Sequence, residues 1–118
     1  MQRQEELETY AIKKIISGGQ TGAGRAGLDA AMEMSIPVGG WYPKGRKAED
    51  GPIDDIYLLQ ETESGDYRVR TGLNVKESDS TIIFSKGKPT GGTALTVKKT
   101  NDLKKPYIFV DLGKDYDF

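Results

Sequence analysis

Glycine residues gather at two places in this sequence, and each cluster has the composition of an anion-binding loop. Ser17–Gly24 reads SGGQTGAG and Ser85–Thr93 reads SKGKPTGGT, and each follows an apolar run and precedes a helical pattern. Glycine lets backbone amides turn toward a ligand, and the positive end of the following helix favours negative charge. The two loops therefore predict a crevice that binds phosphate or another anion. Ordinary strand-to-helix turns with helix caps remain the alternative interpretation.

A basic loop over residues 42–51 lies between the two glycine clusters and could complete such a site. Lys44 and Arg46 could neutralise a phosphate, since a guanidinium offers a planar pair of donors. The loop also contains two acids, so a solvated run of charges without a ligand is the second interpretation. Arg68 and Arg70, in the helical pattern before the next apolar run, leave the same two interpretations open.

Two nucleotide-binding motifs are matched only in part. Gly19 and Gly24 have the spacing of a P-loop, but the Lys and Ser/Thr that hold phosphates and Mg²⁺ do not follow them. Gly22–Gly27 matches GxGxxG, but it begins several residues after the apolar run, where a dinucleotide site needs a tight turn. The sequence therefore predicts neither a P-loop hydrolase nor an NAD site.

The residue types that are absent exclude several kinds of site. The 118 residues contain no Cys and no His, which excludes disulfides, thiol nucleophiles, a Ser-His-Asp triad and metals held by His or Cys. The formal net charge is −1, and this balance disfavours nucleic acid or an anionic membrane as a partner. The polar N-terminus and the lack of a long apolar run predict a cytoplasmic protein without a membrane partner.

Apolar periodicity predicts alternating strands and helices along most of the chain. We expect strands at 12–17, 37–41, 56–59, 80–85 and 106–112, and helices at 2–13, 25–34, 67–77 and 93–103. Alternation with short loops is typical of parallel βαβ units. The predicted fold class is therefore α/β, a Rossmann-like, doubly wound, mostly parallel sheet with helices on both faces.

Burial and domain organisation follow from the same pattern. The runs Ile15-Ile16, Ile82–Phe84 and Ile108–Val110 are expected to be interior strands, buried on both faces. The expected inner positions of the first two main helices are Leu28, Ala31 and Met32, and Val69, Leu73 and Val75. Residues 1–13 are expected to form an N-terminal extension and residues 14–118 a single domain. Because no helical pattern follows the last strand, its open side predicts a homo-oligomer.

Four segments together resemble one protein family. They are Ile15–Ala31 (IISGGQTGAGRAGLDAA), Val38–Ile53 (VGGWYPKGRKAEDGPI), Asp66–Ser85 (DYRVRTGLNVKESDSTIIFS) and Pro89–Thr96 (PTGGTALT). In order and spacing they are similar to the molybdenum cofactor carrier family, a YpsA-like SLOG group related to the LOG nucleotide-processing enzymes. The family usually has Asp where this chain has Gly24. Its members also continue past the last strand, so this chain is expected to be C-terminally truncated relative to them.

The resemblance implies a Rossmann-like fold, a ligand and the residues that hold it. The implied ligand is the molybdenum cofactor, molybdopterin, bound by a dimer or tetramer. Its metal would be held by the pterin's own sulfurs, without direct protein ligands. The residues that match the family's motifs are Gly18, Gly19, Gln20, Thr21, Gly22 and Arg25 in the first loop, Lys44, Gly45 and Arg46 in the basic loop, and Thr90, Gly91, Gly92 and Thr93 in the second loop, which Ser85 opens.

The leading hypothesis is a carrier, without catalytic residues, that holds a phosphate-bearing pterin or a nucleotide-like ligand. One alternative is a phosphoribohydrolase of the LOG type, whose cleavage of a glycosyl bond needs a carboxylate near the sugar. Residues 93–99, after the second glycine loop, contain no acid. Glu49 or Asp50 could supply one if their loop folds over the site. A nucleotide-sensing interaction module is the other alternative.

Overall fold

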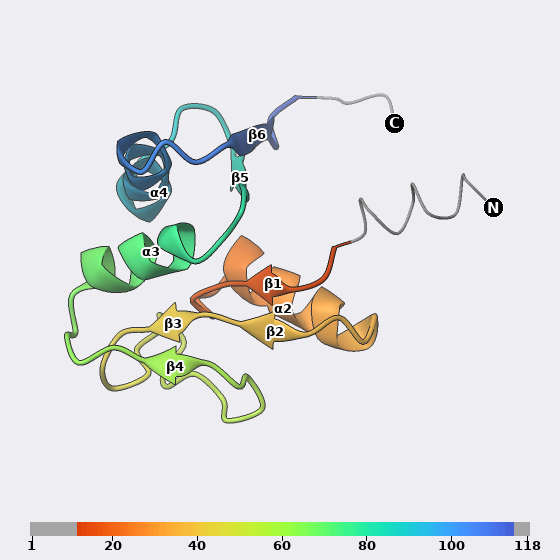
Figure 1. Cartoon of the computed structure of the whole chain (residues 1–118), viewed down its shortest axis with the longest axis vertical. Coiled ribbons are helices and arrows are strands. Elements are labelled where there is room, and N and C mark those ends of the chain that lie inside the picture. Colours follow the sequence, from red (N-terminus) through yellow and green to blue (C-terminus); the bar gives the residue numbers. More distant parts are fainter. Residues whose placement is uncertain (1–11, 115–118) are drawn as a thin grey trace.

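The structure, a computed structural model, describes residues 12–114 as a compact α/β fold with three helices and short parallel strands (Figure 1). The elements are β1 (Ile15–Ile16), α2 (Ala23–Glu33), β2 (Val38–Gly39), β3 (Trp41–Tyr42), β4 (Gln60–Glu61), α3 (Tyr67–Lys76), β5 (Thr81–Ser85), α4 (Gly91–Asp102) and β6 (Tyr107–Asp111). The strand–helix alternation is thus confirmed. Nearly all of the predicted helix at 2–13 lies outside the described residues.

The strands form three parallel pairs, β1–β2, β3–β4 and β5–β6. β2 and β3 are separated only by Gly40, whose φ of 133° is in the region that favours glycine. The Ser17 amide donates to the Gly39 carbonyl (3.0 Å) on one side of this chain segment, and the Gln60 amide donates to the Gly40 carbonyl (2.8 Å) on the other. Within residues 12–114 no pairing joins β5–β6 to the other strands, so a continuous doubly wound sheet stays a prediction.

The core includes two side chains of the long loop between β3 and β4. Leu28 of α2 packs with Tyr42 of β3 and with Ile53 and Tyr57 of the long loop between β3 and β4. Burying large apolar side chains of this kind supplies the main stabilisation of a small domain. Tyr42 at the start of the basic loop and Ile53 just after its end therefore hold this loop against α2.

The helices occur close to the predicted positions, but two of the predicted inner residues are exposed. Leu28 and Ala31 are buried in α2, whereas Met32 is exposed. In α3 the buried residues are Thr71 and Val75, and Val69 is exposed. The buried face of α3 carries Thr71 and Val75, which have i, i+4 spacing. Apolar patterning predicted Val69 on this face, but the small polar residue Thr71 lies there instead.

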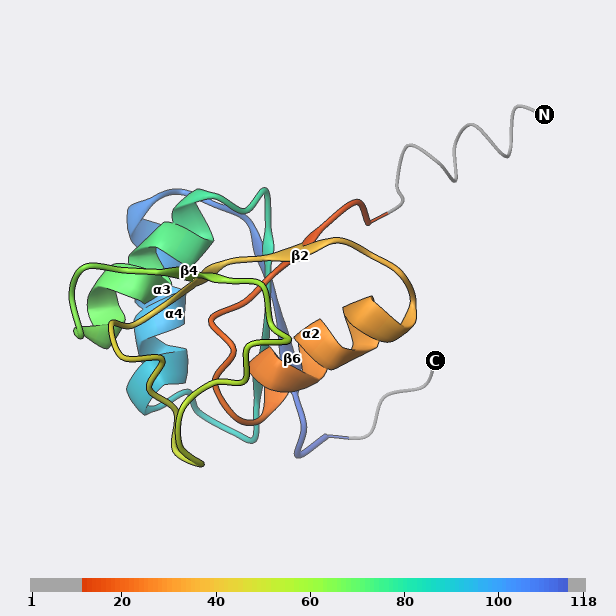
Figure 2. The ribbon, with the colours of Figure 1, turned by 90° about the horizontal axis from the view of Figure 1, so that it is seen from below.

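The expectation that β5 and β6 are buried on both faces is wrong. Ile83 is 4% exposed, but Ile82 is 56% exposed and Ile108, its partner across the strand pair, is 63% exposed. Successive side chains of a strand point to opposite faces. Helices α3 and α4 lie together on one side of the strands, with α4 against β5, and α2 lies on the other side beside β1 and β2 (Figure 2). Helices α3 and α4 therefore leave the face of Ile82, Phe84 and Ile108 open, and these side chains are exposed. Helix α2 approaches this face beside Phe84, where the two line a cavity of about 400 Å³.

The predicted strand at 56–59 is also wrong. This segment is a turn, and the strand is β4, two residues whose side chains are exposed. Tyr57 packs into the core from this turn. Because the β4 side chains are exposed, apolar patterning does not detect its backbone pairing with β3. Among the described residues, no helix is both long enough and apolar enough to cross a membrane.

Candidate functional site

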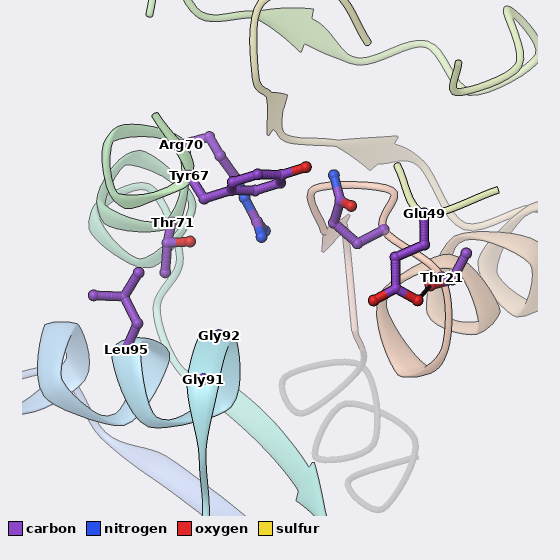
Figure 3. Close-up of a pocket in the computed structure, with 9 residues that line it drawn as sticks. Thr21, Glu49, Tyr67, Arg70, Thr71, Gly91, Gly92 and Leu95 are labelled. Atoms are coloured by element: carbon purple, nitrogen blue, oxygen red, sulfur yellow. Dashed lines mark hydrogen bonds between the residues drawn. The ribbon is translucent and has the colours of Figure 1, made fainter. Parts of the chain in front are cut away.

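A cavity of about 470 Å³ lies where the two glycine loops face each other. Its lining comes from four segments: Gln20 and Thr21 of the first loop, Glu49 of the basic loop, Tyr67, Arg70 and Thr71 of α3, and Gly91, Gly92 and Leu95 at the start of α4 (Figure 3). A volume of this size suits a small-molecule ligand. The fold therefore brings residues from both predicted anion-binding loops to one cavity.

Both helices that begin at these loops start without a side-chain cap. The N-caps Gly22 of α2 and Thr90 of α4 make no capping hydrogen bond through a side chain, and neither first turn carries an acid. By contrast, Asp66 caps α3 by accepting from the Arg68 amide. The first backbone bond of α4 runs from the Ala94 amide to the Thr90 carbonyl (3.2 Å). The amides before Ala94 thus have no partner in the helix and can serve an anion.

Side chains shape the first glycine loop from within. Ser17 Oγ donates to the Gly24 carbonyl (2.8 Å) and accepts from the Gly19 amide (3.3 Å). Arg25 donates through Nε (3.2 Å) and Nη2 (3.0 Å) to the Gly19 carbonyl, and its Nη1 pairs with Asp50. That pairing raises the pKa of Arg25 and lowers the pKa of Asp50. Arg25 thus braces the loop from the side, although its role toward a ligand stays a prediction.

The basic loop folds over the first glycine loop, but its cations do not reach the cavity. Gln20 Nε2 donates to the Lys47 carbonyl (2.7 Å) and Thr21 Oγ1 donates to Glu49 (3.4 Å). Arg46 donates to the carbonyls of Ile53 (2.6 Å) and Asp54 (2.7 Å) and to the hydroxyl of Tyr42 (2.7 Å). These bonds occupy Nε and both terminal nitrogens of Arg46.

The remaining predicted site residues lie at the edges of the cavity or outside it. Lys44, Gly45 and Arg46 are absent from the lining within the described range, and the Gly45 amide donates to Glu61 (3.0 Å). Ser85 ends β5, and its hydroxyl donates to the Gly87 carbonyl (3.2 Å). Whether any of these residues contacts a ligand stays a prediction.

Tyr67, Arg70 and Thr71 line the cavity, although the sequence analysis gave no role to two of them and left Arg70 open. They lie at i, i+3 and i+4 on α3, which places them on one face of the helix. Arg70 is half-buried, and burial lowers the pKa of its guanidinium, with only a partial counter-effect from Tyr67. Their spacing in the sequence is enough to predict that the three residues share one helix face. It is not enough to predict that this face is turned toward the glycine loops.

The comparison with protein families identifies the chain. Residues 15–118 match the family model described as the circularly permuted YpsA SLOG family. The chain belongs to this family. The resemblance expected from the four sequence segments is thereby confirmed.

One solved structure extends this assignment of the SLOG chain. It is a protein from Syntrophus aciditrophicus SB named "putative molybdenum carrier protein", with 54% sequence identity and a TM-score of 0.85. The match covers 86% of the present chain and 65% of that protein, so the chain spans less than two thirds of its relative's length. A comparison with curated proteins gave no match. Within residues 12–114, no group of three or more acids or other metal-binding side chains is placed to hold a metal ion.

Proposed function

We propose that this SLOG-family chain is a carrier that holds a phosphate-bearing ligand of the molybdopterin type between its two glycine loops. The observation that carries the proposal is the shared cavity, which is lined by Gln20 and Thr21 of one loop and by Gly91 and Gly92 of the other. Two uncapped helix N-termini without acids begin at these loops, and such termini favour phosphate.

The chemistry of the lining residues fits that ligand. Backbone amides and the hydroxyl of Thr71 can bind phosphate oxygens, and the ring of Tyr67 offers a flat apolar surface to a pterin. The molybdenum would be cargo on the pterin's sulfurs, so these residues need only hold the organic part. The name of the 54%-identical relative supports the carrier function, and a Rossmann-like doubly wound sheet is the fold we propose around the site.

Native mass spectrometry of freshly purified protein tests the proposed function. We expect a retained mass that corresponds to a phosphorylated pterin or nucleotide-like compound, and saturable uptake of molybdopterin by ligand-free protein. Protein that carries no small molecule and binds neither molybdopterin, adenine nucleotides nor phosphate would contradict the proposal.

A second candidate function is hydrolysis of a nucleoside monophosphate, and the position of Glu49 favours it. The loop of Glu49 folds onto the first glycine loop, and its carboxylate lines the cavity while accepting from Thr21 (3.4 Å). We propose Glu49 as the base in this alternative. Glu49 would take a proton from water as the water oxygen bonds to C1′ and the C1′–N bond breaks. The same proton would then pass to the departing nucleobase nitrogen, which leaves the free nucleobase and ribose 5-phosphate.

Glu49→Gln separates this candidate from the carrier function. If Glu49 is the base, wild-type protein releases adenine and ribose 5-phosphate from AMP, and Glu49→Gln lowers the rate by about 100-fold or more. Glu33→Gln, an exposed change at the far end of α2, is the matched control and should leave the rate unchanged. Wild-type protein that binds AMP without releasing adenine would eliminate the hydrolase.

We also propose that the chain forms a dimer or tetramer through the open face of β5–β6. Ile82, Phe84 and Ile108 are exposed on that face. Soluble monomers rarely expose a contiguous apolar surface of this kind, which is typical of protein–protein interaction sites. A second copy of the same chain offers the same apolar side chains, and an isologous interface between them would bury both.

Ile108→Lys is the variant that tests the assembly. We expect analytical ultracentrifugation at micromolar concentration to show a dimer or tetramer for wild type and a monomer for Ile108→Lys, because an interface would bury the new charge without a partner. Leu58→Lys, at a side chain 80% exposed on the loop before β4, should keep the wild-type assembly. A monomeric wild type would overturn the proposal.

A further inference from the structure

We infer that Arg70 is the residue that neutralises the oxyanion of the bound ligand. Nothing in the family match or in the relative's name assigns this role, and it deepens the proposed function by naming the charged contact of the same cavity. Arg70 reaches from α3 toward the space between the glycine loops, beside Tyr67 (Figure 3).

Arg70 differs from every other arginine in the described part of the chain. Arg25 pairs with Asp50, Arg46 lies 3.7 Å from Asp55, and Arg68 pairs with Asp66 (2.8 Å). Among the arginines of residues 12–114, Arg70 alone has no carboxylate within ion-pair distance. A half-buried cation without a counter-charge is costly, and an anionic ligand in the cavity would remove that cost.

Part of the Arg70 guanidinium is already buried away from water. The Nε atom is buried and has no hydrogen-bond partner among the described residues. Its one aromatic contact is the ring of Tyr67, with 5.4 Å between Cζ and the ring centroid. Buried polar atoms are almost always paired in folded proteins. An unpaired buried nitrogen beside a cavity indicates a side chain that is positioned for a ligand. A hydrogen bond or ion pair formed there is stronger than one in water, because the local dielectric constant is low.

The first glycine loop leaves space for the Arg70 side chain. A Cβ on Gly18 would lie 2.6 Å from Arg70 Nη1 and 3.3 Å from Arg70 Cδ. Gly18 is buried, so the absence of its side chain makes the space in which the guanidinium lies. The loop backbone and the cation are thus packed together and face the ligand as one surface.

The cavity has a positive side and a negative side, and this distribution of charge indicates which chemical class of ligand it can bind. Arg70 and the uncapped start of α4 lie on one side, and the Glu49 carboxylate lies on the other, beside Thr21 (Figure 3). A ligand that suits both sides has a tetrahedral oxyanion at one end and hydrogen-bond donors, such as ring N–H or hydroxyl groups, at the other. A phosphate monoester of a heterocyclic compound has this pattern. A free tetrahedral oxyanion such as phosphate or molybdate would satisfy the first side alone.

Arg70→Met tests the inference, because methionine keeps the apolar part of the side chain and removes the charge. The probes are AMP, adenosine, inorganic phosphate and molybdate, titrated into full-length protein by calorimetry. We expect Arg70→Met to bind the anionic probes roughly 10- to 100-fold more weakly, as loss of a charged hydrogen bond predicts. Arg70→Lys should retain part of the affinity. Arg68→Met removes the same charge from an exposed site on the same helix and should change affinity less than about twofold, because solvent screens it.

Thermal unfolding without ligand separates binding from a structural role. We expect the Tm of Arg70→Met to equal or exceed that of wild type, since a cation without a partner is removed, and we expect the Tm increase caused by phosphate to be lost. Gly18→Ala should also weaken phosphate binding, by displacing the Arg70 guanidinium. Binding of AMP but not of the free anions identifies an ester as the ligand, and binding of all three supports a free oxyanion.

The failures of the two proposals are distinguishable. Unchanged binding by Arg70→Met, or a Tm well below that of wild type with phosphate stabilisation intact, overturns the role of Arg70 and leaves the carrier function standing. Equal binding of AMP and adenosine also overturns it, because the phosphate would then go unrecognised. A wild-type protein that binds none of the probes and no molybdopterin overturns the proposed function itself.

Discussion

Gly91→Asp is expected to weaken binding of any phosphate-bearing ligand by at least about 100-fold. Two unit charges of like sign about 4 Å apart near a protein surface repel by about 4 kcal/mol, and the new carboxylate would lie where the α4 amides face the cavity. No neighbouring atom blocks the new side chain, because a Cβ at this glycine meets no atom within 4 Å among the described residues. Calorimetric titration with AMP or molybdopterin measures the effect.

Gly91→Asn is the matched control for this variant. Gly91 has a φ of 53°, in the left-handed region that Asp and Asn tolerate better than other residues. The two substitutions therefore share size and backbone strain and differ in charge alone. We expect Gly91→Asn to keep most of the wild-type affinity. Equal affinities for the two variants would mean that no anion binds at the start of α4.

Gly40→Ala is expected to destabilise the fold by about 3 kcal/mol or more, a large part of a domain's usual 5–15 kcal/mol. Its Cβ would overlap the Ser17 carbonyl oxygen and lie 2.9 Å from the backbone nitrogen of Ser17. The neighbour is backbone, so no side-chain movement can relieve the clash. Gly40 also accepts from the Gln60 amide (2.8 Å), and the movement would disturb the pairing of β1 and β4 with the segment between them. The free energy of unfolding in urea is the quantity to measure.

Gly72→Ala, within α3, provides the opposite expectation. A Cβ there would make ordinary contacts of 3.8 and 3.9 Å with the Lys99 side chain, and alanine restricts the unfolded chain. We expect a gain of about 0.5–1 kcal/mol. If both glycine variants change stability by the same small amount, the close approach of Gly40 to Ser17 is wrong.

Several features of this chain were determined by the sequence alone, because they depend on residues close together in the chain. Apolar runs followed by glycine loops and helical patterns predicted β5, α4 and β6 nearly in place, and the absence of Cys and His limited the chemistry of any site. The similarity of four segments to one family was also sufficient to predict the family, since it needs only order and spacing.

Other features were decided by tertiary structure, because they depend on which distant group a side chain meets. Both Arg46 and Arg70 lie between the two glycine clusters in the sequence, and only Arg46 was predicted as a site residue. In the fold, Arg46 bonds to two carbonyls and the hydroxyl of Tyr42, whereas Arg70 faces the cavity with no carboxylate of the described residues within ion-pair distance. Apolar patterning likewise predicts that Ile82 and Ile108 are buried. The pattern shows only that these side chains are apolar enough to pack under another element. Whether a neighbouring element covers them depends on how the helices pack, and here α4 packs against the opposite face of β5 while α2 packs beside β1 and β2.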